Sequence, residues 1–198
     1  MTEVQEDGWG QLAHEMHAEV VAYLASLEEV ASGEAPDAAL PVLLLAVGQL
    51  CAAGSRLGAL VDVVPVERFE PDSGPDTDLE RIRSSLHAQL GGLDAYCDLE
   101  DPVLSGEVTS GSLSADLVSV AADLCHALDH YRADHLTEAM WWWQFSYLSS
   151  WGERAAAALR VLQALLAHVR LDADDEQVME AEMAALHQVD EVPAPVRA

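Results

Sequence analysis

The chain has 198 residues, of which 35 are Asp or Glu and nine are Arg or Lys, so its formal net charge at pH 7 is −26. A surface this acidic repels nucleic-acid phosphates and anionic lipid headgroups, because it lacks the bases that would neutralise them. The composition therefore excludes direct nucleic-acid binding. We interpret the negative charge mainly as a means of keeping the protein soluble. Alternatively, the acidic surface binds a basic partner, as a DNA mimic does.

The cysteines, the N-terminal sequence and the apolar runs together indicate the cellular compartment of the protein. Cys51, Cys97 and Cys125 lack the close spacing of a zinc site or a small disulfide scaffold, so we interpret them as reduced thiols. The N-terminus is acidic and polar, unlike a secretory signal. The uncharged run 38–55 approaches the lower limit of about 17 residues for a membrane span, but Pro41 interrupts it, which favours a buried helix. We expect a cytoplasmic protein without membrane association.

Apolar residues recur every three or four positions over most of the chain, which predicts an all-α fold, a compact bundle of five to seven helices. A first helix is predicted over residues 11–31, with Gly33 as its stop signal. A second helix begins near Pro36, a residue that a first turn tolerates, and runs to about Leu60. Apolar residues nearly surround this second helix, so we place it at the centre of the bundle.

The middle of the chain is predicted to alternate loops and helices. Residues 62–77 contain three prolines and several acids, which is typical of a loop, and a third helix follows over 79–90. This helix breaks at two glycines and resumes to about Leu99. Residues 100–112 are predicted to be a second loop, and Ser112 or Ser114 then caps a helix that runs to about Asp134.

The last core helix is predicted from Thr137 to about Val169, which completes a single all-α domain over residues 1–171. Residues 172–198 form an acidic C-terminal segment, for which we predict a weakly amphipathic helix over 176–188 and a frayed end. Two turns in the domain, in residues 30–40 and 131–140, resemble the helix hairpins of tetratricopeptide repeats. No 34-residue period connects them, so we predict two hairpins and no repeat array.

Four of the five tryptophans lie in the stretch MWWWQFSYLSSWG, residues 140–152. On a helix, Trp141, Trp142 and Trp143 would fan across about 200° and could not all face one groove. A continuous apolar stripe at helical spacing predicts which positions face the core. It consists of Trp141, Phe145, Leu148, Trp151, Ala155, Leu159, Leu162 and Leu166.

Trp142 and Trp143 lie on the two mixed faces of the same predicted helix. Either a neighbouring helix covers them, or they contribute to a groove or a partner interface, where Trp, Tyr and Arg are enriched. The candidate binding surface therefore consists of Trp142, Trp143, Tyr147 and Arg154.

Three segments together resemble a family of uncharacterised all-α proteins that is widespread in actinobacteria. They are ALPVLLLAVGQLCAAGSRLGA, DVVPVERFEPDSGPD and EAMWWWQFSYLSSWGERAAAALRVLQALLAHVR, with WWWQFSYLSSWG as the most specific signature. The resemblance covers about residues 10–171. It implies an all-α fold, and it brings no assigned activity.

Asp123, His126 and His130 are the best candidates for metal ligands, because positions i, i+3 and i+7 lie on one face of a helix. The bundle would have to supply a further ligand, and the HEMH stretch that contains His14 and His17 could do so. A pair of helical histidines beside acidic residues is more often a hydrogen-bonded surface pair. The sequence contains no nucleophile elbow, Walker loop or dinucleotide-binding glycine motif.

These patterns favour an intracellular helical adaptor or regulatory protein that acts by protein–protein binding, without chemistry or a cofactor of its own. Two alternatives remain open at this point. One is a metal-dependent helical-bundle enzyme that uses a divalent metal at His126 and His130. The other is an acidic partner, or DNA mimic, of a basic protein.

Overall fold

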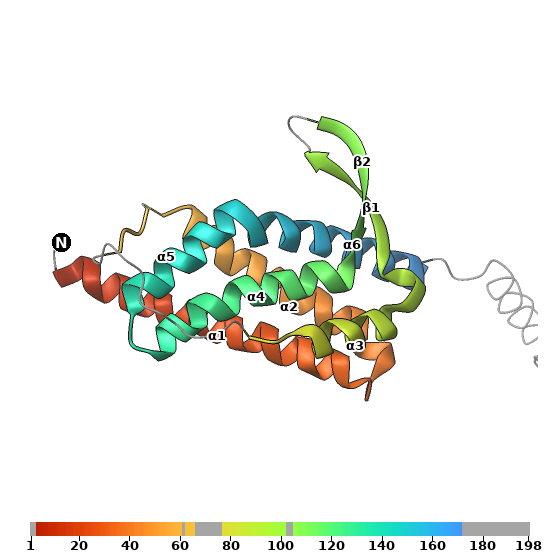
Figure 1. The fold of residues 1–198 in the computed structure, drawn as a ribbon, viewed down its shortest axis with the longest axis horizontal. Helices are drawn as coiled ribbons and strands as arrows, with labels where there is room; N and C mark the ends of the chain where they lie inside the picture. Colours follow the sequence, from red (N-terminus) through yellow and green to blue (C-terminus); the bar gives the residue numbers. More distant parts are fainter. Residues whose placement is uncertain (1–2, 61, 66–76, 102–104, 172–198) are drawn as a thin grey trace, which may run out of the picture.

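The computed structural model describes residues 3–60, 62–65, 77–101 and 105–171. This part of the chain confirms the predicted all-α class, since it forms a compact bundle of six α-helices with one small β-hairpin (Figure 1). The predicted helix at 176–188 lies outside the described residues. The helices are α1 (Glu3–Ser32), α2 (Ala39–Gly58), α3 (Glu80–Leu90), α4 (Leu113–Arg132), α5 (Leu136–Ser146) and α6 (Gly152–Leu171).

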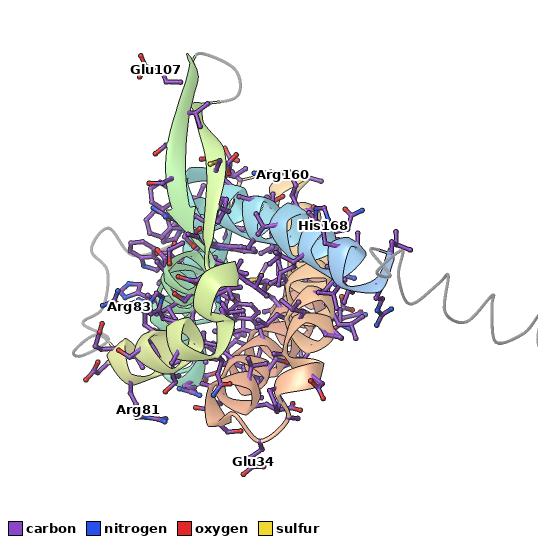
Figure 2. All side chains as sticks on the ribbon, turned by 90° about the vertical axis from the view of Figure 1, so that its right-hand side faces the viewer. Glu34, Arg81, Arg83, Glu107, Arg160 and His168 are labelled. Atoms are coloured by element: carbon purple, nitrogen blue, oxygen red, sulfur yellow. The ribbon has the colours of Figure 1, made fainter. Side chains whose placement is uncertain are left out.

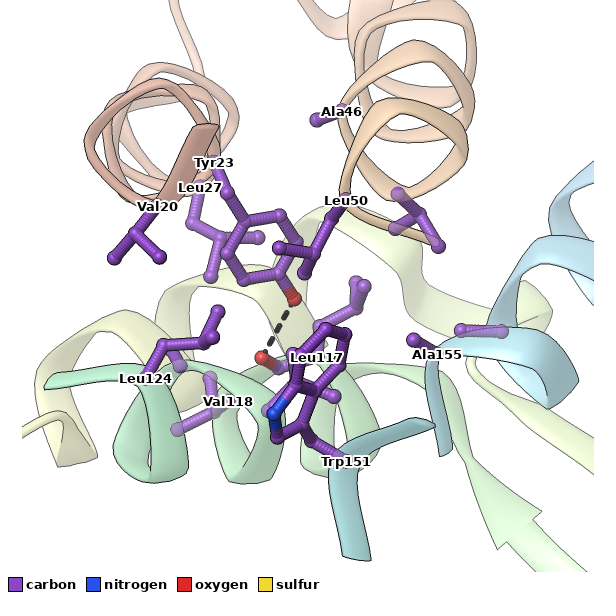
Figure 3. Close-up of a cluster of buried hydrophobic side chains, with 14 of the residues drawn as sticks. Val20, Tyr23, Leu27, Ala46, Leu50, Leu117, Val118, Leu124, Trp151 and Ala155 are labelled. Carbon is purple, nitrogen blue, oxygen red and sulfur yellow. Dashed lines mark hydrogen bonds between the residues drawn. The ribbon is translucent and has the colours of Figure 1, made fainter. Parts of the chain in front are cut away.

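The core lies where α1, α2, α4 and α6 pack against one another. Tyr23 and Trp151 are among its largest fully buried side chains. The Tyr23 hydroxyl donates a hydrogen bond of 2.8 Å to the backbone carbonyl of Leu117, so this buried phenol has a partner (Figure 3). Burial raises the pKa of Tyr23 well above its usual range, because it disfavours the phenolate.

Helix α2 is half-buried, whereas the sequence predicted it at the centre of the bundle. Eight of its residues are buried, and it packs on α1 and α6, while Leu45 on its outer face is 66% exposed. Together with the preceding turn, Pro36–Gly58 is long and apolar enough to cross a membrane by length and composition. The core helix of a soluble protein meets the same criterion.

Both predicted helix hairpins are present. Gly33 follows α1 with a φ of 71°, and Asp134 follows α4 with a φ of 66°. Left-handed backbone of this kind ends a helix, and Gly and Asp are among the residues that tolerate it. The turns bring α1 against α2 and α4 against α5. The predicted cap at Ser112 is confirmed, since its hydroxyl accepts a hydrogen bond from the Ala115 amide.

The two predictions for the segment between α3 and α4 were wrong. In place of a resumed helix and a loop, β1 (Ala95–Asp101) and β2 (Ser105–Ser112) pair as an antiparallel hairpin that projects from the bundle (Figure 1). The strands are rich in Asp, Ser and Gly, so local propensity gave little sign of them. Gly111 lies directly opposite Tyr96 in the hairpin, and its missing side chain leaves room for the Tyr96 ring.

Asp94 fastens the base of this hairpin to the bundle. Its carboxylate accepts hydrogen bonds from the Ser112 hydroxyl and the Ser114 amide, each at 2.7 Å, and pairs with Nδ1 of His87 at 2.9 Å. The Asp94 carbonyl accepts a further bond of 2.8 Å from the Leu113 amide. Burial alone would raise the pKa of Asp94, but these hydrogen bonds outweigh it and hold the pKa below its usual range.

We expect Asp94→Asn to cost about 1–3 kcal/mol of unfolding free energy at neutral pH, because it weakens a buried, charge-assisted network. A carboxylate whose pKa is lowered by folding stabilises the protein fully above the unfolded value of about 3.9, and that contribution is lost as the pH falls through the folded value. The difference between wild type and variant should therefore shrink as the pH is lowered from about 5 to about 2. Urea unfolding across this range measures it, and parallel pH profiles would contradict the assignment.

Candidate functional site

A π-helical turn changes the orientation of the aromatic segment. The turn, η3 (Tyr147–Trp151), joins α5 to α6. It interrupts the predicted apolar stripe, which extends on both sides of it. A π turn accommodates one extra residue, so the positions that face the core shift by one on its N-terminal side. Met140 and Gln144 are buried where Trp141 and Phe145 were predicted to be. The inward orientation predicted for Phe145 and Leu148 was therefore wrong, and Trp141 is only partly buried against the core.

Trp143 belongs to the core, so its predicted place on a binding surface was wrong. Its side chain is fully buried, and its Nε1 donates a 3.4 Å hydrogen bond to the carbonyl of Leu124. Trp151 is fully buried as predicted, and its Nε1 donates to the carbonyl of Trp143 at 3.3 Å. These two indoles belong to the core of the bundle, where they pack α5, the π turn and α6 against α4.

Trp142 is partly buried at the edge of the helical surface. Its ring meets the ring of His126 edge-on, with 4.5 Å between centroids, and lies 4.8 Å from the ring of Trp141. Its Nε1 is buried and has no hydrogen-bond partner among the described residues. Of the four residues predicted to form a binding surface, it is the one that lies beside exposed aromatic side chains.

Tyr147 covers two glycines of α2. An added Cβ at Gly54 or Gly58 would come within 2.6 Å of the Tyr147 ring, so the ring lies directly on this helix. The Tyr147 hydroxyl is 3.4 Å from the hydroxyl of Ser55. Tyr147 therefore holds α2 against the π turn and does not extend a surface with Trp142.

Arg154 lies at the foot of the hairpin. Its guanidinium donates a 3.3 Å hydrogen bond to Asp116, and the other carboxylate oxygen of Asp116 accepts a 2.5 Å bond from the Tyr96 hydroxyl. Burial, followed by the nearby Asp116 carboxylate, raises the pKa of Tyr96 far above its usual range. The structure therefore separates Arg154 from Trp142 and gives it a partner of its own.

The structure shows a different surface on α5 and η3, which we call the uncharged aromatic surface: Trp141, Trp142, Phe145 and Leu148. The rings of Trp141 and Phe145 stack, with centroids 5.2 Å apart and planes 10° from parallel. Phe145 is 48% exposed and Leu148 is 63% exposed. No charged residue occurs between Glu138 and Glu153 in the sequence. In so acidic a chain, this surface is an exception.

The proposed metal ligands are not gathered into a site. Asp123 accepts a 2.7 Å hydrogen bond from the Ser150 hydroxyl. His130 is buried, and its ring meets that of His126 edge-on at 5.3 Å. Within the described ranges, no group of three His, Cys, Asp or Glu side chains could hold a metal ion. The structure does not bring Asp123, His126 and His130 together as a ligand set, because helical spacing alone does not make three side chains converge.

His14 and His17 have other contacts. The His17 ring stacks on Tyr131 with 4.4 Å between centroids, and Nδ1 of His14 is 3.4 Å from the Tyr131 hydroxyl. Burial, and then the neighbouring His14 and Arg132, lower the pKa of His17. These contacts join α1 to the end of α4. Among the described residues, neither histidine forms a metal-ligand group with His126 and His130.

A groove of about 630 Å³ lies between the hairpin and α6. The groove could not be anticipated from the sequence, because it depends on a hairpin that was not predicted. Figure 2 shows Arg160 on the helix beside the hairpin and Glu107 near the hairpin's outer end. The groove is lined by Cys97, Asp98, Val108, Glu153, Ala156, Ala157 and Arg160.

These features define a helical bundle with a projecting hairpin and an exposed, uncharged aromatic surface, and without a recognisable catalytic constellation among the described residues. The chain belongs to the family described as Domain of unknown function (DUF5063), whose family model matches residues 7–168. This confirms the resemblance to an uncharacterised family.

A solved structure supports the fold. Protein BF1032 from Bacteroides fragilis matches with a TM-score of 0.61 at 17% sequence identity, over 76% of this chain and 89% of that chain. At this identity the likeness shows the fold alone. None of the curated proteins compared with the chain matches it. Neither the family nor the solved structure indicates a specific function.

Proposed function

We propose that this protein is an intracellular adaptor or regulatory protein that binds a partner protein through the uncharged aromatic surface. The observation that carries the proposal is the stack of Trp141 on Phe145 beside Leu148, since Phe145 and Leu148 are among the most exposed large apolar side chains of the helical bundle. Exposed apolar residues that gather on one surface mark interaction sites more often than single exposed residues do.

The chemistry of this surface suits a protein partner better than a small polar ligand. Aromatic side chains supply large contact areas at a small cost in conformational entropy, and Trp is enriched in the energetic centres of interfaces. The absence of charge from residues 139–152 reduces the number of ionised groups that a partner would have to desolvate at this segment. Elsewhere, the net charge of −26 opposes contact with nucleic acid and anionic membranes, which we do not propose as partners.

The surface also gives a reason for the π turn. A regular α-helix would turn Phe145 and Leu148 inward along the predicted stripe, whereas the extra residue of the turn leaves both exposed. π turns in α-helices occur frequently at functional sites. The turn interrupts the regular α-helix, and Phe145 and Leu148, which the sequence pattern would have buried, are exposed as a result.

We expect Phe145→Glu and Leu148→Glu to abolish co-purification of the partner protein from cells that express the chain. A carboxylate in the centre of an apolar interface remains desolvated and unpaired, which costs several kcal/mol. Val169→Glu on α6 is the matched control, because Val169 is 66% exposed and Leu148 is 63% exposed. All three variants should keep the wild-type circular dichroism spectrum and melting temperature to within about 2 °C.

Retention of the same partner by both Phe145→Glu and Leu148→Glu would contradict the proposal. So would its equal loss from Val169→Glu, because added negative charge alone would then account for the effect. The alternative of an acidic chain that mimics DNA predicts the opposite order, in which neutral changes at acidic positions weaken binding and changes at Phe145 do not.

A further inference from the structure

The groove between the hairpin and α6 offers a second surface, made of residues that the proposed function does not use. Its floor on α6 is apolar, with Ala156 and Ala157, and Val108 on β2 is 71% exposed. The ionised residues lie around this floor. They are Asp98 and Glu153, which are acidic, and Arg160, which is basic.

The groove follows an edge of the hairpin. Cys97 and Asp98 are successive residues of β1, so their side chains point to opposite faces of the sheet, yet both line the groove. Val108 of β2 is paired with Leu99 and so lies on the Cys97 face, whereas the Asp98 side chain, from the opposite face of β1, reaches Arg160 of α6. The groove therefore takes in both faces of β1 and runs beside the outer edge of that strand. Within the described part of the chain, the sheet has two strands, so each strand has one edge that no further strand covers. The backbone groups of such an edge can pair with an added strand.

Charge complementarity indicates the chemistry of the occupant. Arg160 pairs with Asp98 at 2.8 Å, so these two charges offset one another, and the carboxylate of Glu153 gives the lining a net negative charge. The groove lies on a chain of net charge −26. A second copy of this chain, or any acidic segment, would be repelled, whereas a segment with basic residues would be attracted. The small side chains of the floor leave room for apolar groups.

We propose that this groove binds an extended segment of a partner protein in which basic and apolar residues alternate, added as a third strand along the edge of the hairpin. Alternation follows from the strand geometry, because successive side chains of the segment would point in turn towards the apolar floor and towards the acidic rim and solvent. Main-chain hydrogen bonds to the hairpin edge would contribute affinity, and Glu153 would select for basic residues. This proposal does not depend on the uncharged aromatic surface.

The test uses a fluorescein-labelled peptide of sequence Gly-Arg-Val-Arg-Val-Arg-Val-Gly, with both ends blocked, and measures fluorescence anisotropy against the full chain. The measurement is made at about 0.15 M salt, which screens long-range attraction to the acidic surface. A second peptide has the same sequence with alternate backbone amides N-methylated, which blocks strand pairing without changing the charge. Glu153→Arg tests the groove, and Glu28→Arg, at an exposed position of α1, is the control with the same change of charge.

We expect saturable binding of the first peptide, and at least about tenfold weaker binding both of the methylated peptide and to Glu153→Arg, or about 1.4 kcal/mol in each case. Glu28→Arg should bind as the wild type does. Equal weakening by Glu28→Arg would overturn the proposal, because net charge would then explain the binding. Equal affinity for the methylated peptide, or no binding of the first peptide at about 1 mM chain, would also overturn it. Neither result bears on Phe145 or Leu148.

Discussion

Gly54→Ala is expected to lower the free energy of unfolding by about 3 kcal/mol, which would make it one of the most damaging single-methyl additions in the chain. An added Cβ would lie 2.4 Å from the Trp151 ring and 2.6 Å from the Tyr147 ring. Trp151 is fully buried, so its ring cannot move aside without disturbing the core. Urea unfolding followed by circular dichroism measures the effect.

Gly48→Ala, six residues earlier in the same helix, provides the control. An added Cβ at Gly48 would meet only Leu159 Cδ1, at 3.8 Å, which is an ordinary contact. Because Ala is favoured over Gly inside a helix, this variant should gain about 0.5–1 kcal/mol. The two substitutions thus have the same chemistry and opposite expected signs. A loss at Gly48 as large as the loss at Gly54 would show that the close approach of α2 to the π turn is not the cause.

Trp143→Ala is expected to cost about 3–5 kcal/mol, because it removes a fully buried indole and leaves a cavity at the centre of the bundle. It also leaves the Leu124 carbonyl without the hydrogen bond that Nε1 of Trp143 donates. The same urea unfolding experiment measures the loss, which is a large share of the unfolding free energy of about 5–15 kcal/mol that is typical of folded domains.

Trp141→Ala separates the core from the surface. Trp141 is partly buried and stacks on the exposed Phe145, so its removal should cost less than about 1.5 kcal/mol. It should nevertheless weaken partner binding, because Trp141 belongs to the uncharged aromatic surface. If Trp141→Ala proved as destabilising as Trp143→Ala, the register assigned to the π turn would be wrong, and with it the surface.

The helices could be predicted well from the sequence, because their signals are local. Periodic apolar residues predicted α1, α3 and α4, and Gly33 and Ser112 lie where a helix stop and a cap were expected. The hairpin could not be predicted in this way. Its strands are largely polar, and they are held by pairing across the hairpin and by the contacts of Asp94 and Tyr96 with α4.

The candidate site was predicted only in part. The sequence drew attention to the aromatic segment, but the faces of its residues were assigned on the assumption of a regular α-helix, and the π turn shifts that pattern by one residue. The shift could not be seen in the apolar pattern, because one of the inward positions is occupied by the polar residue Gln144. Gln144 faces inward because its amide accepts a 2.8 Å hydrogen bond from the Val63 amide and donates one of 2.9 Å to the Leu57 carbonyl. A hydrophobic pattern cannot anticipate a buried glutamine, so Phe145 was assigned to the core in its place.

The most direct measurement of partner binding is site-specific photocrosslinking in cells that express the protein. A benzophenone amino acid replaces Phe145, and in a control it replaces Val21 of α1, which is 41% exposed where Phe145 is 48% exposed. The adaptor role predicts one discrete crosslinked species at position 145 that contains a second protein and is absent at position 21. No product at position 145, the same products at both positions, or a product made of two copies of this chain would contradict it.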